Sequence, residues 1–191
     1  MKKQIVAAVK MLLILTVVTG VIYPLIITGI AEVAFPSKAN GSLIASNGKI
    51  VGSELIGQGT DSVIYFHGRP SSVGYNPMPS GGSNWGPIAD TLRKIMDGNR
   101  NDFIKANGLD SNATVPVEMI TASASGLDPD ISPEAARLQI GRVASARHFS
   151  AEQTEKLRQL VESMVTPPQF GILGEPRVNV LALNIALDSL K

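Results

Sequence analysis

The sequence predicts an α+β protein with one N-terminal transmembrane helix followed by a single extracytoplasmic domain. An uncharged apolar run lies near the N-terminus, several later segments show helical spacing of apolar residues, and one short segment is β-branched and aromatic. A chain of 191 residues has room for one such domain and its anchor. The predicted regions are a cytoplasmic N-terminus at 1–10, a membrane helix at 11–31, a linker at 32–48 and the outer domain at 49–191.

The run from Met11 to Ala31 is uncharged and follows Lys2, Lys3 and Lys10. Since a helix rises about 1.5 Å per residue and the hydrocarbon core is about 30 Å thick, a run of this length crosses the bilayer. The alternative is a cleaved signal peptide, but its apolar part is typically about 7 to 15 residues, so a retained anchor is favoured. Because lysines precede the span, the positive-inside rule places the N-terminus in the cytoplasm and the remaining chain outside.

One face of the predicted span is suited to a partner helix. Pro24 lies within the run and removes one helical hydrogen bond, which predicts a kink that a neighbouring helix can compensate. Small residues allow close helix approach. The alternative for this face is lipid contact. The stripe predicted to face a partner consists of Thr16, Gly20, Tyr23 and Ile27.

Composition and turn residues divide the first half of the outer domain. The β-branched and aromatic segment Val63 to Phe66, bounded by turn residues, predicts a short strand. Ser71 to Pro87 is dense in Gly, Pro, Ser and Asn and predicts a loop. Ile88 to Lys105 has apolar residues at helical spacing, with a predicted weak point at Asp97 to Asn99.

Capping patterns predict the helices of the second half. Ser132 to Glu134 is a hydroxyl cap, a proline and a carboxylate, which start a helix that should end near Arg147. Ser150 and Gln153 form a capping-box pattern, and the helix after them must end before Pro167.

The C-terminal run from Val178 to Leu190 has two interpretations. Its first residues alternate like a strand, whereas Leu183 and Leu187 repeat at helical spacing after a possible cap at Asn179. We favour the helix.

Composition and motifs exclude several functions. Seventeen Lys and Arg against sixteen Asp and Glu leave a net charge of +1, so the chain has no charge excess for nucleic acid. It has no cysteine, which excludes disulfides, thiolate nucleophiles and cysteine-ligated metals. Gly48-Lys49-Ile50 lacks the first glycine and the hydroxyl of a phosphate loop. We therefore expect no catalytic residue, no metal site and no cofactor of the chain's own.

The alternative function is a membrane-anchored periplasmic serine hydrolase, with Ser80 or Ser83, His67 and Asp128 as its triad. The segment GGSNW around Ser83 lacks the closing glycine of a nucleophile elbow, which disfavours this reading. We instead expect His67 to be a hydrogen-bonded loop residue. Asp128 and Asp130 are expected to build a turn rather than an acid–base pair.

Several motifs in a fixed order carry a resemblance to a known family. They are Tyr65-Phe66-His67-Gly68-Arg69-Pro70-Ser71, Ser80-Gly81-Gly82-Ser83-Asn84, Ser125-Gly126-Leu127-Asp128-Pro129, Ile131-Ser132-Pro133, Arg142-Val143-Ala144 and Pro176-Arg177-Val178-Asn179-Val180. After a single span, they resemble the C subunit of the Kdp potassium-transporting ATPase. The resemblance covers the chain from the lysine-flanked span to its end.

The resemblance implies a non-catalytic subunit of a bacterial inner-membrane complex that imports potassium with ATP. Its partners would be the ion-conducting A subunit, the P-type ATPase B subunit and the small F subunit, together with the lipid bilayer. The family's C subunit is described as stabilising assembly and as a catalytic chaperone that raises the ATP affinity of the B subunit. ATP and potassium would thus be handled by the complex. Because an exterior domain faces away from cytoplasmic ATP, we expect partner binding rather than direct ATP contact.

The loop from Gly68 to Pro87 is the candidate docking surface, because aromatic and flexible apolar side chains are enriched at interfaces. An inward-folded loop that covers the core is the alternative. For Arg142 and Arg147 the choice lies between a solvated helix face and pairing with acidic groups on a partner or within the domain. The candidate interface residues are His67, Arg69, Tyr75 and Trp85.

Overall fold

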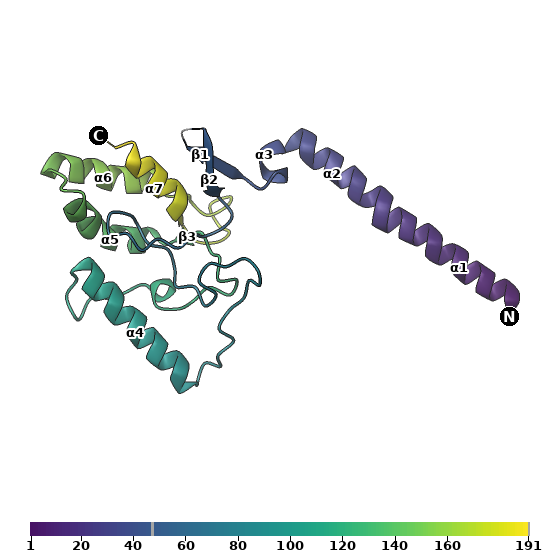
Figure 1. Ribbon diagram of the computed structural model, residues 1–191, viewed down its shortest axis with the longest axis horizontal. Helices are drawn as coiled ribbons and strands as arrows, with labels where there is room; N and C mark the ends of the chain where they lie inside the picture. Colours follow the sequence, from purple (N-terminus) through teal and green to yellow (C-terminus); the bar gives the residue numbers. More distant parts are fainter. Residues whose placement is uncertain (47, 191) are drawn as a thin grey trace. The chain divides into compact units, whose positions relative to one another are not determined.

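The computed structural model describes residues 1–46 and 48–190, and the chain separates into two compact units, Met1–Leu43 and Ile44–Lys191. Most of the first unit is one long helix (Figure 1). This helix, Lys2–Ala34, is 33 residues long and apolar enough to cross a membrane. The rest of the chain buries none of its most apolar stretch. A helix through residues 11–31 is thus confirmed, and it extends beyond them at both ends. Its segments are α1 (Lys2–Val17), the π-helical turn η1 (Val18–Ile22) and α2 (Tyr23–Ala34).

At the position where Pro24 predicts a kink, the helix contains one π-helical turn, η1. It ends at Ile22, directly before the turn that contains the proline. Proline has no N–H to donate and its ring crowds the carbonyl four residues earlier, here that of Gly20. A wider π turn relieves this crowding, and π turns are a recognised cause of helix irregularity. The helix therefore continues past Pro24.

The segment predicted as a linker, residues 32–48, contains regular structure. α2 continues to Ala34, and α3 (Pro36–Ala39) follows it. The side-chain amide of Asn40 donates to Glu32 Oε2 at 3.0 Å and to the carbonyl of Pro36 at 2.9 Å, which ties α3 to the end of α2. β1 (Leu43–Ser46) follows and pairs with β2 (Lys49–Ser53). The second unit, Ile44–Lys191, is called the outer unit below, after the domain predicted there.

Four α-helices form the body of the described outer unit (Figure 1). α5 and α6 make the most extensive helix pair, while α4 packs on α5 and α7 packs on α6. Apolar side chains from α5, α6 and α7 meet in one core, joined by Phe66. The helices are α4 (Asp90–Asn107), α5 (Pro133–Ala146), α6 (Ala151–Ser163) and α7 (Val180–Asp188).

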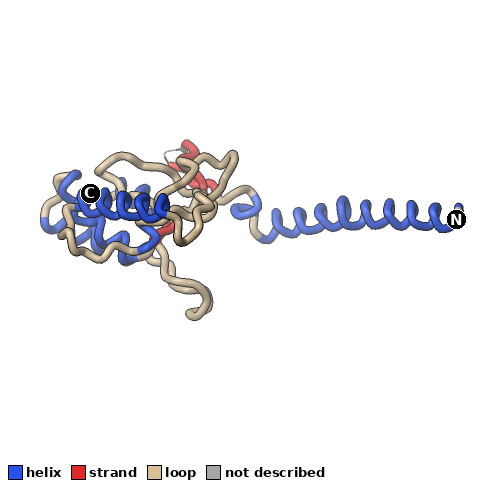
Figure 2. Tube along the Cα trace, turned by 90° about the horizontal axis from the view of Figure 1, so that it is seen from below, coloured by secondary structure: helices blue, strands red, loops and turns tan. Residues whose placement is uncertain are grey.

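The strands of the described outer unit are short, and much of the remaining chain is loop (Figure 2). β3 (Asp130–Ile131) and β4 (Val178–Asn179) pair antiparallel, with Ile131 opposite Val178. A short 3-10 helix, η2 (Val117–Met119), lies between α4 and β3 in the chain. The architecture is α+β with helices dominant, as predicted.

All three predicted helix caps are present. Ser132 Oγ accepts from the N–H of Ala135 at 3.1 Å at the start of α5. At the start of α6, Ser150 and Gln153 form a complete capping box, and α6 ends at Ser163. Asn179 Oδ1 caps α7, while the two residues before α7 form β4, so both interpretations of this run hold in part.

The weak point predicted at Asp97 to Asn99 does not interrupt α4, which runs unbroken. Glycine in a helix interior costs only about 1 kcal/mol relative to alanine. Tertiary contacts outweigh this cost, because Asn99 Nδ2 donates to the carbonyl of Ile120 at 2.9 Å and Phe103 is buried.

Candidate functional site

The segment from Val63 to Arg69 lies at the centre of the outer unit. The prediction that it begins with a strand is wrong. The structure has turns at Val63 and Ile64 and no strand assignment through Arg69. Side chains of α5 and α7 bind the backbone groups that a neighbouring strand would have bound. The composition thus correctly marks a buried segment and misidentifies its hydrogen-bond partners.

Two buried amide side chains each bind both backbone groups of one residue. Asn184 accepts from the N–H of Phe66 at 2.8 Å and donates to its carbonyl at 2.9 Å. Gln139 accepts from the N–H of His67 at 2.8 Å and donates to its carbonyl at 3.1 Å. This reciprocal pairing satisfies buried polar groups that would otherwise be costly.

Arg142 is the buried cation of the site. Its guanidinium donates to the carbonyls of Val63 at 2.6 Å and Tyr65 at 2.9 Å, and also to Asn107 Oδ1 and Gln139 Oε1. These acceptors are neutral oxygens, and burial lowers the pKa of Arg142 to about 10. Neither a solvated face nor pairing with an acid of the domain holds for Arg142: its side chain points into the domain and binds neutral oxygens of the segment and of neighbouring amides.

Arg147 pairs with an acidic residue of the same domain, so the prediction of acidic pairing is confirmed for this arginine and the solvated-face interpretation is wrong. Its Nη2 donates to Asp188 Oδ1 at 2.7 Å, and its Nε donates to the carbonyl of Ile64 at 2.8 Å. The guanidinium also lies 4.9 Å from the centroid of the Tyr65 ring. Tyr65 donates its hydroxyl to Asp188 Oδ2 at 2.9 Å, and this bond raises the pKa of Tyr65.

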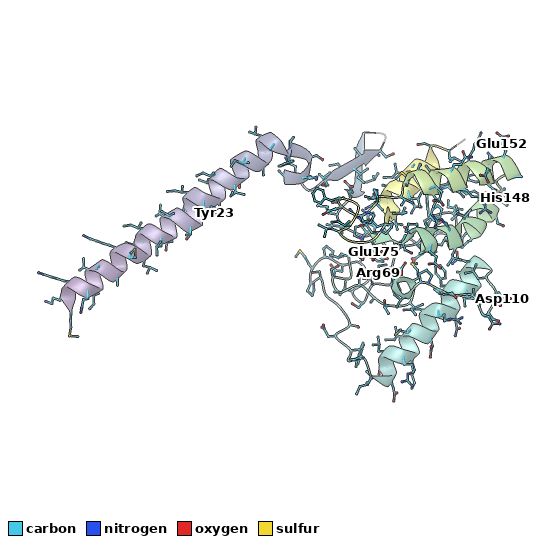
Figure 3. The ribbon with its side chains drawn as sticks, turned by 180° about the vertical axis from the view of Figure 1, so that it is seen from behind. Tyr23, Arg69, Asp110, His148, Glu152 and Glu175 are labelled. Atoms are coloured by element: carbon cyan, nitrogen blue, oxygen red, sulfur yellow. The ribbon has the colours of Figure 1, made fainter. Side chains whose placement is uncertain are left out.

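Arg69 ties the end of the segment to the turn before β3. Its Nη1 lies 2.6 Å from Asp128 Oδ2, while Asp128 Oδ1 accepts from the N–H of Asp130 at 3.1 Å. The predicted turn is confirmed at Asp128, whereas Asp130 lies in β3 and its carboxylate pairs with Arg177 at 3.0 Å. Tyr75 donates its hydroxyl to the carbonyl of Arg69, and burial raises the pKa of Tyr75. Figure 3 shows Arg69 within the body of the outer unit.

The predicted loop is hydrogen-bonded to Ser125 and Gly126 through Ser71 and Gly81. Ser71 Oγ donates to the carbonyl of Gly126 at 2.7 Å, and the N–H of Gly81 donates to the carbonyl of Ser125 at 2.9 Å. Gly126 has a φ of +71°, and an added Cβ would lie 2.4 Å from a methyl group of Val73. Only glycine fits this approach.

The structure brings three of the four candidate interface residues together and separates the fourth. His67, Arg69 and Tyr75 line one cavity of about 590 Å³. Trp85 lines a different groove, of about 510 Å³, with Leu92 of α4 and Ile120 as neighbours. Tyr75 is folded inward, whereas Trp85 is 50% exposed. Both interpretations of the loop thus hold for different parts of it, and contact with a partner stays a prediction.

The residues of the hydrolase alternative have other partners. The His67 ring bonds to the carbonyl of Ser62 at 3.0 Å, which confirms a hydrogen-bonded loop residue, and burial lowers its pKa. Asp128 is occupied by Arg69 and by its own turn. The proposed base and acid of a triad are thus engaged in structural contacts.

The predicted stripe on the apolar helix is interrupted by η1, which lies between Thr16 and Tyr23. A π turn holds more residues than an α turn, so the positions after it rotate relative to those before it. A Cβ added at Gly20 would meet nothing within 4 Å, and Tyr23 is 63% exposed. Figure 3 labels Tyr23 on this helix. Partner contact by this stripe stays a prediction.

Sequence reasoning missed Gln139 and Asn184 as positioning residues. Gln139 lies beside Ile140 on the buried face of α5, and Asn184 follows Leu183 on the buried face of α7. A polar residue on an otherwise apolar helix face is a signal that could have found both, because buried polar groups need partners.

Comparison with known proteins gives a consistent result. The family model described as KdpC, the c chain of the K+-transporting ATPase, matches residues 5–189. The chain is 50% identical to a potassium-transporting ATPase KdpC subunit of Bradyrhizobium diazoefficiens, covering 98% of both chains. It is also 50% identical to the proteins of that name from Gemmatimonas aurantiaca, over 96% of this chain and 91% of the relative, and Herpetosiphon aurantiacus, over 96% and 95%. The chain therefore belongs to the KdpC family of K+-transporting ATPase c chains.

Proposed function

We propose that this chain is a membrane-anchored, non-catalytic subunit of a potassium-importing ATPase. The observation that carries the proposal is the family match over residues 5–189, which includes both the apolar helix and the outer unit. The buried polar residues of the outer unit support a non-catalytic role, because the side chains of Gln139, Arg142 and Asn184 hydrogen-bond to backbone groups of the central segment.

The orientation proposed is an N-terminus in the cytoplasm and an outer unit outside the bacterial inner membrane. Lys2, Lys3 and Lys10 precede the most apolar part of the helix, and the positive-inside rule favours keeping them in the cytoplasm. The partners in this membrane would be the A, B and F subunits of the Kdp complex. The helix stripe and the Trp85 groove are the surfaces offered to them.

In this arrangement the chain would raise the ATP affinity of the B subunit indirectly. An external unit cannot touch cytoplasmic ATP, so any effect must pass through contacts between subunits, as a coupling free energy between sites. A fastened loop and a continuous helix are suited to such a role, since both hold a fixed surface toward a partner.

The test is to purify the complex formed by the A, B and F subunits with and without this chain. We expect potassium-stimulated ATPase activity in both preparations, with a higher KM for ATP when the chain is absent, and no turnover by the chain alone. Activity of the purified chain alone would contradict the proposal. Ester hydrolysis that disappears in Ser83→Ala would favour the hydrolase instead. A reporter fused after Lys191 that works only in the cytoplasm would reverse the proposed orientation.

A further inference from the structure

A cavity of about 440 Å³ is lined by the β1–β2 hairpin and α7 and takes no part in the proposed function. β2 packs closely on α7 beside it, because a Cβ added at Gly52 would lie 2.8 Å from a methyl group of Leu181. The volume falls in the range of small-molecule sites. The wall residues that matter to the argument are Val51, Tyr65, Tyr75, Asp128, Ile185 and Asp188.

The charged groups of the wall are both acids. Asp128 and Asp188 line the cavity, while their partners Arg69 and Arg147 are not among its described lining residues. In each pair the guanidinium is the more buried side chain: Arg147 is 15% exposed against 51% for Asp188, and Arg69 is 23% exposed against 30% for Asp128. A carboxylate has about four acceptor positions, so each retains capacity beyond its present bonds.

The rest of the wall is aromatic and aliphatic. Tyr65 and Tyr75 both line the cavity, and aromatic faces attract cations. The Arg147 guanidinium already lies 4.9 Å from the centroid of the Tyr65 ring, so Tyr75 is the ring proposed to receive a bound cation. Val51 and Ile185 add apolar surface. An anion would meet two carboxylates, and a bare metal ion would leave the apolar wall unmatched, because hard cations take shells of oxygen ligands.

We propose that this cavity binds a small organic ammonium ion, with its alkyl groups against the aromatic and aliphatic wall and its charge toward Asp128 and Asp188. Such an ion matches both parts of the wall. Its alkyl groups cost little free energy to dehydrate beside apolar side chains, and its charge is attracted to carboxylates and aromatic faces. The proposal does not depend on the function proposed above.

The probe is choline, compared with 3,3-dimethylbutan-1-ol, which has the same shape without the charge. Calorimetric titration of the full chain in detergent should show saturable choline binding at least about ten-fold tighter than binding of the alcohol. Equal affinities for choline and the alcohol would show that the cavity does not recognise the charge and would overturn the proposal. The absence of saturable choline binding would overturn it as well. Displacement of choline by an equal concentration of K+ would also overturn it, in favour of a simple ion site.

Two variants locate the binding. Asp188→Asn keeps the shape of the side chain and removes its charge, so it should weaken choline binding about ten-fold. Glu162→Gln, at an exposed acid bonded to Arg137 outside the cavity, is the matched control and should bind as the parent does. Ile185→Trp fills the cavity and should abolish binding in protein that still melts cooperatively. Unchanged binding in either Asp188→Asn or Ile185→Trp would overturn the assignment of the site.

Discussion

The side-chain amide of Asn184 binds the N–H of Phe66 at 2.8 Å and its carbonyl at 2.9 Å, as the backbone of a neighbouring strand would. The two residues are 118 positions apart in the chain, and both are buried. The Asn184 side chain therefore fixes the backbone of the central segment to α7, in addition to the bond between Tyr65 and Asp188.

Replacing Asn184 should destabilise the outer unit. Asn184→Leu removes both bonds and leaves buried backbone groups of Phe66 without partners, at about 1–3 kcal/mol for each group. Chemical denaturation of the full chain in detergent measures the loss. Asn112→Leu, at an exposed asparagine, should change stability by less than about 0.5 kcal/mol. Equal effects at both positions would show that the pairing contributes nothing.

Arg142 should not tolerate lysine. Arg142→Lys cannot reach the four residues that the guanidinium now binds, so we expect a loss of about 3 kcal/mol. Arg137→Lys is the control, because Arg137 and Glu162 are both 52% exposed and such surface pairs contribute about 0–1 kcal/mol. The unfolding free energies of the two variants provide the comparison. A difference below about 1 kcal/mol would contradict the assigned role of Arg142.

Trp85→Ala should separate partner binding from stability. Because Trp85 is 50% exposed, its truncation should leave the melting temperature of the chain nearly unchanged. Phe66→Ala, in the core, should cost about 3–5 kcal/mol. If the groove docks a partner, Trp85→Ala should weaken association with the ion-conducting subunit by more than about 2 kcal/mol. A large fall in melting temperature with association retained would remove Trp85 from the interface.

Gly20→Leu tests the helix stripe. Leucine increases the hydrophobicity of the span but blocks close helix approach, so membrane insertion should persist while recovery of the complex in mild detergent falls. Gly29→Leu is the matched control, since an added Cβ meets nothing within 4 Å at either glycine and Gly29 is outside the stripe. Equal recovery of the two variants would assign the Gly20 face to lipid.

Acid should destabilise the outer unit in part through His67. Burial lowers the pKa of His67 from its ordinary value of 6.5, so below that pH the unfolded chain binds a proton that the folded chain does not. The neutral, half-buried His67 therefore contributes its full stabilisation above pH 6.5, and this contribution is lost as the pH falls toward the lower pKa of His67 in the folded chain. His67→Gln should lose less melting temperature than the parent between about pH 7.5 and 5.5.

The control for this pH series is His148→Asn at the other histidine, where a φ of +56° suits asparagine. The difference between each variant and the parent is plotted against pH. Parallel curves for the parent and His67→Gln would exclude a contribution from His67.

The sequence by itself determined the apolar span, the loop from Ser71 to Pro87 and the helix starts at Ser132, Ser150 and Asn179. These features rest on contacts between close neighbours: each cap binds an N–H three residues ahead. Such signals are complete within a short window of sequence, so periodicity and capping rules can read them.

Only the tertiary structure decided what the segment from Val63 to Arg69 binds, where Arg142 and Arg147 point, and which parts of the loop fold inward. Composition predicted a strand because it registers burial and β-branched side chains, and it does not register whether a strand or a side chain supplies the hydrogen bonds. The partners Gln139 and Asn184 lie 72 and 118 residues away. The candidate interface also divided: Tyr75 donates to the part-buried carbonyl of Arg69, whereas Trp85 is half exposed. Which part of the loop folds inward depends on residues 123–126, to which Ser71 and Gly81 bond.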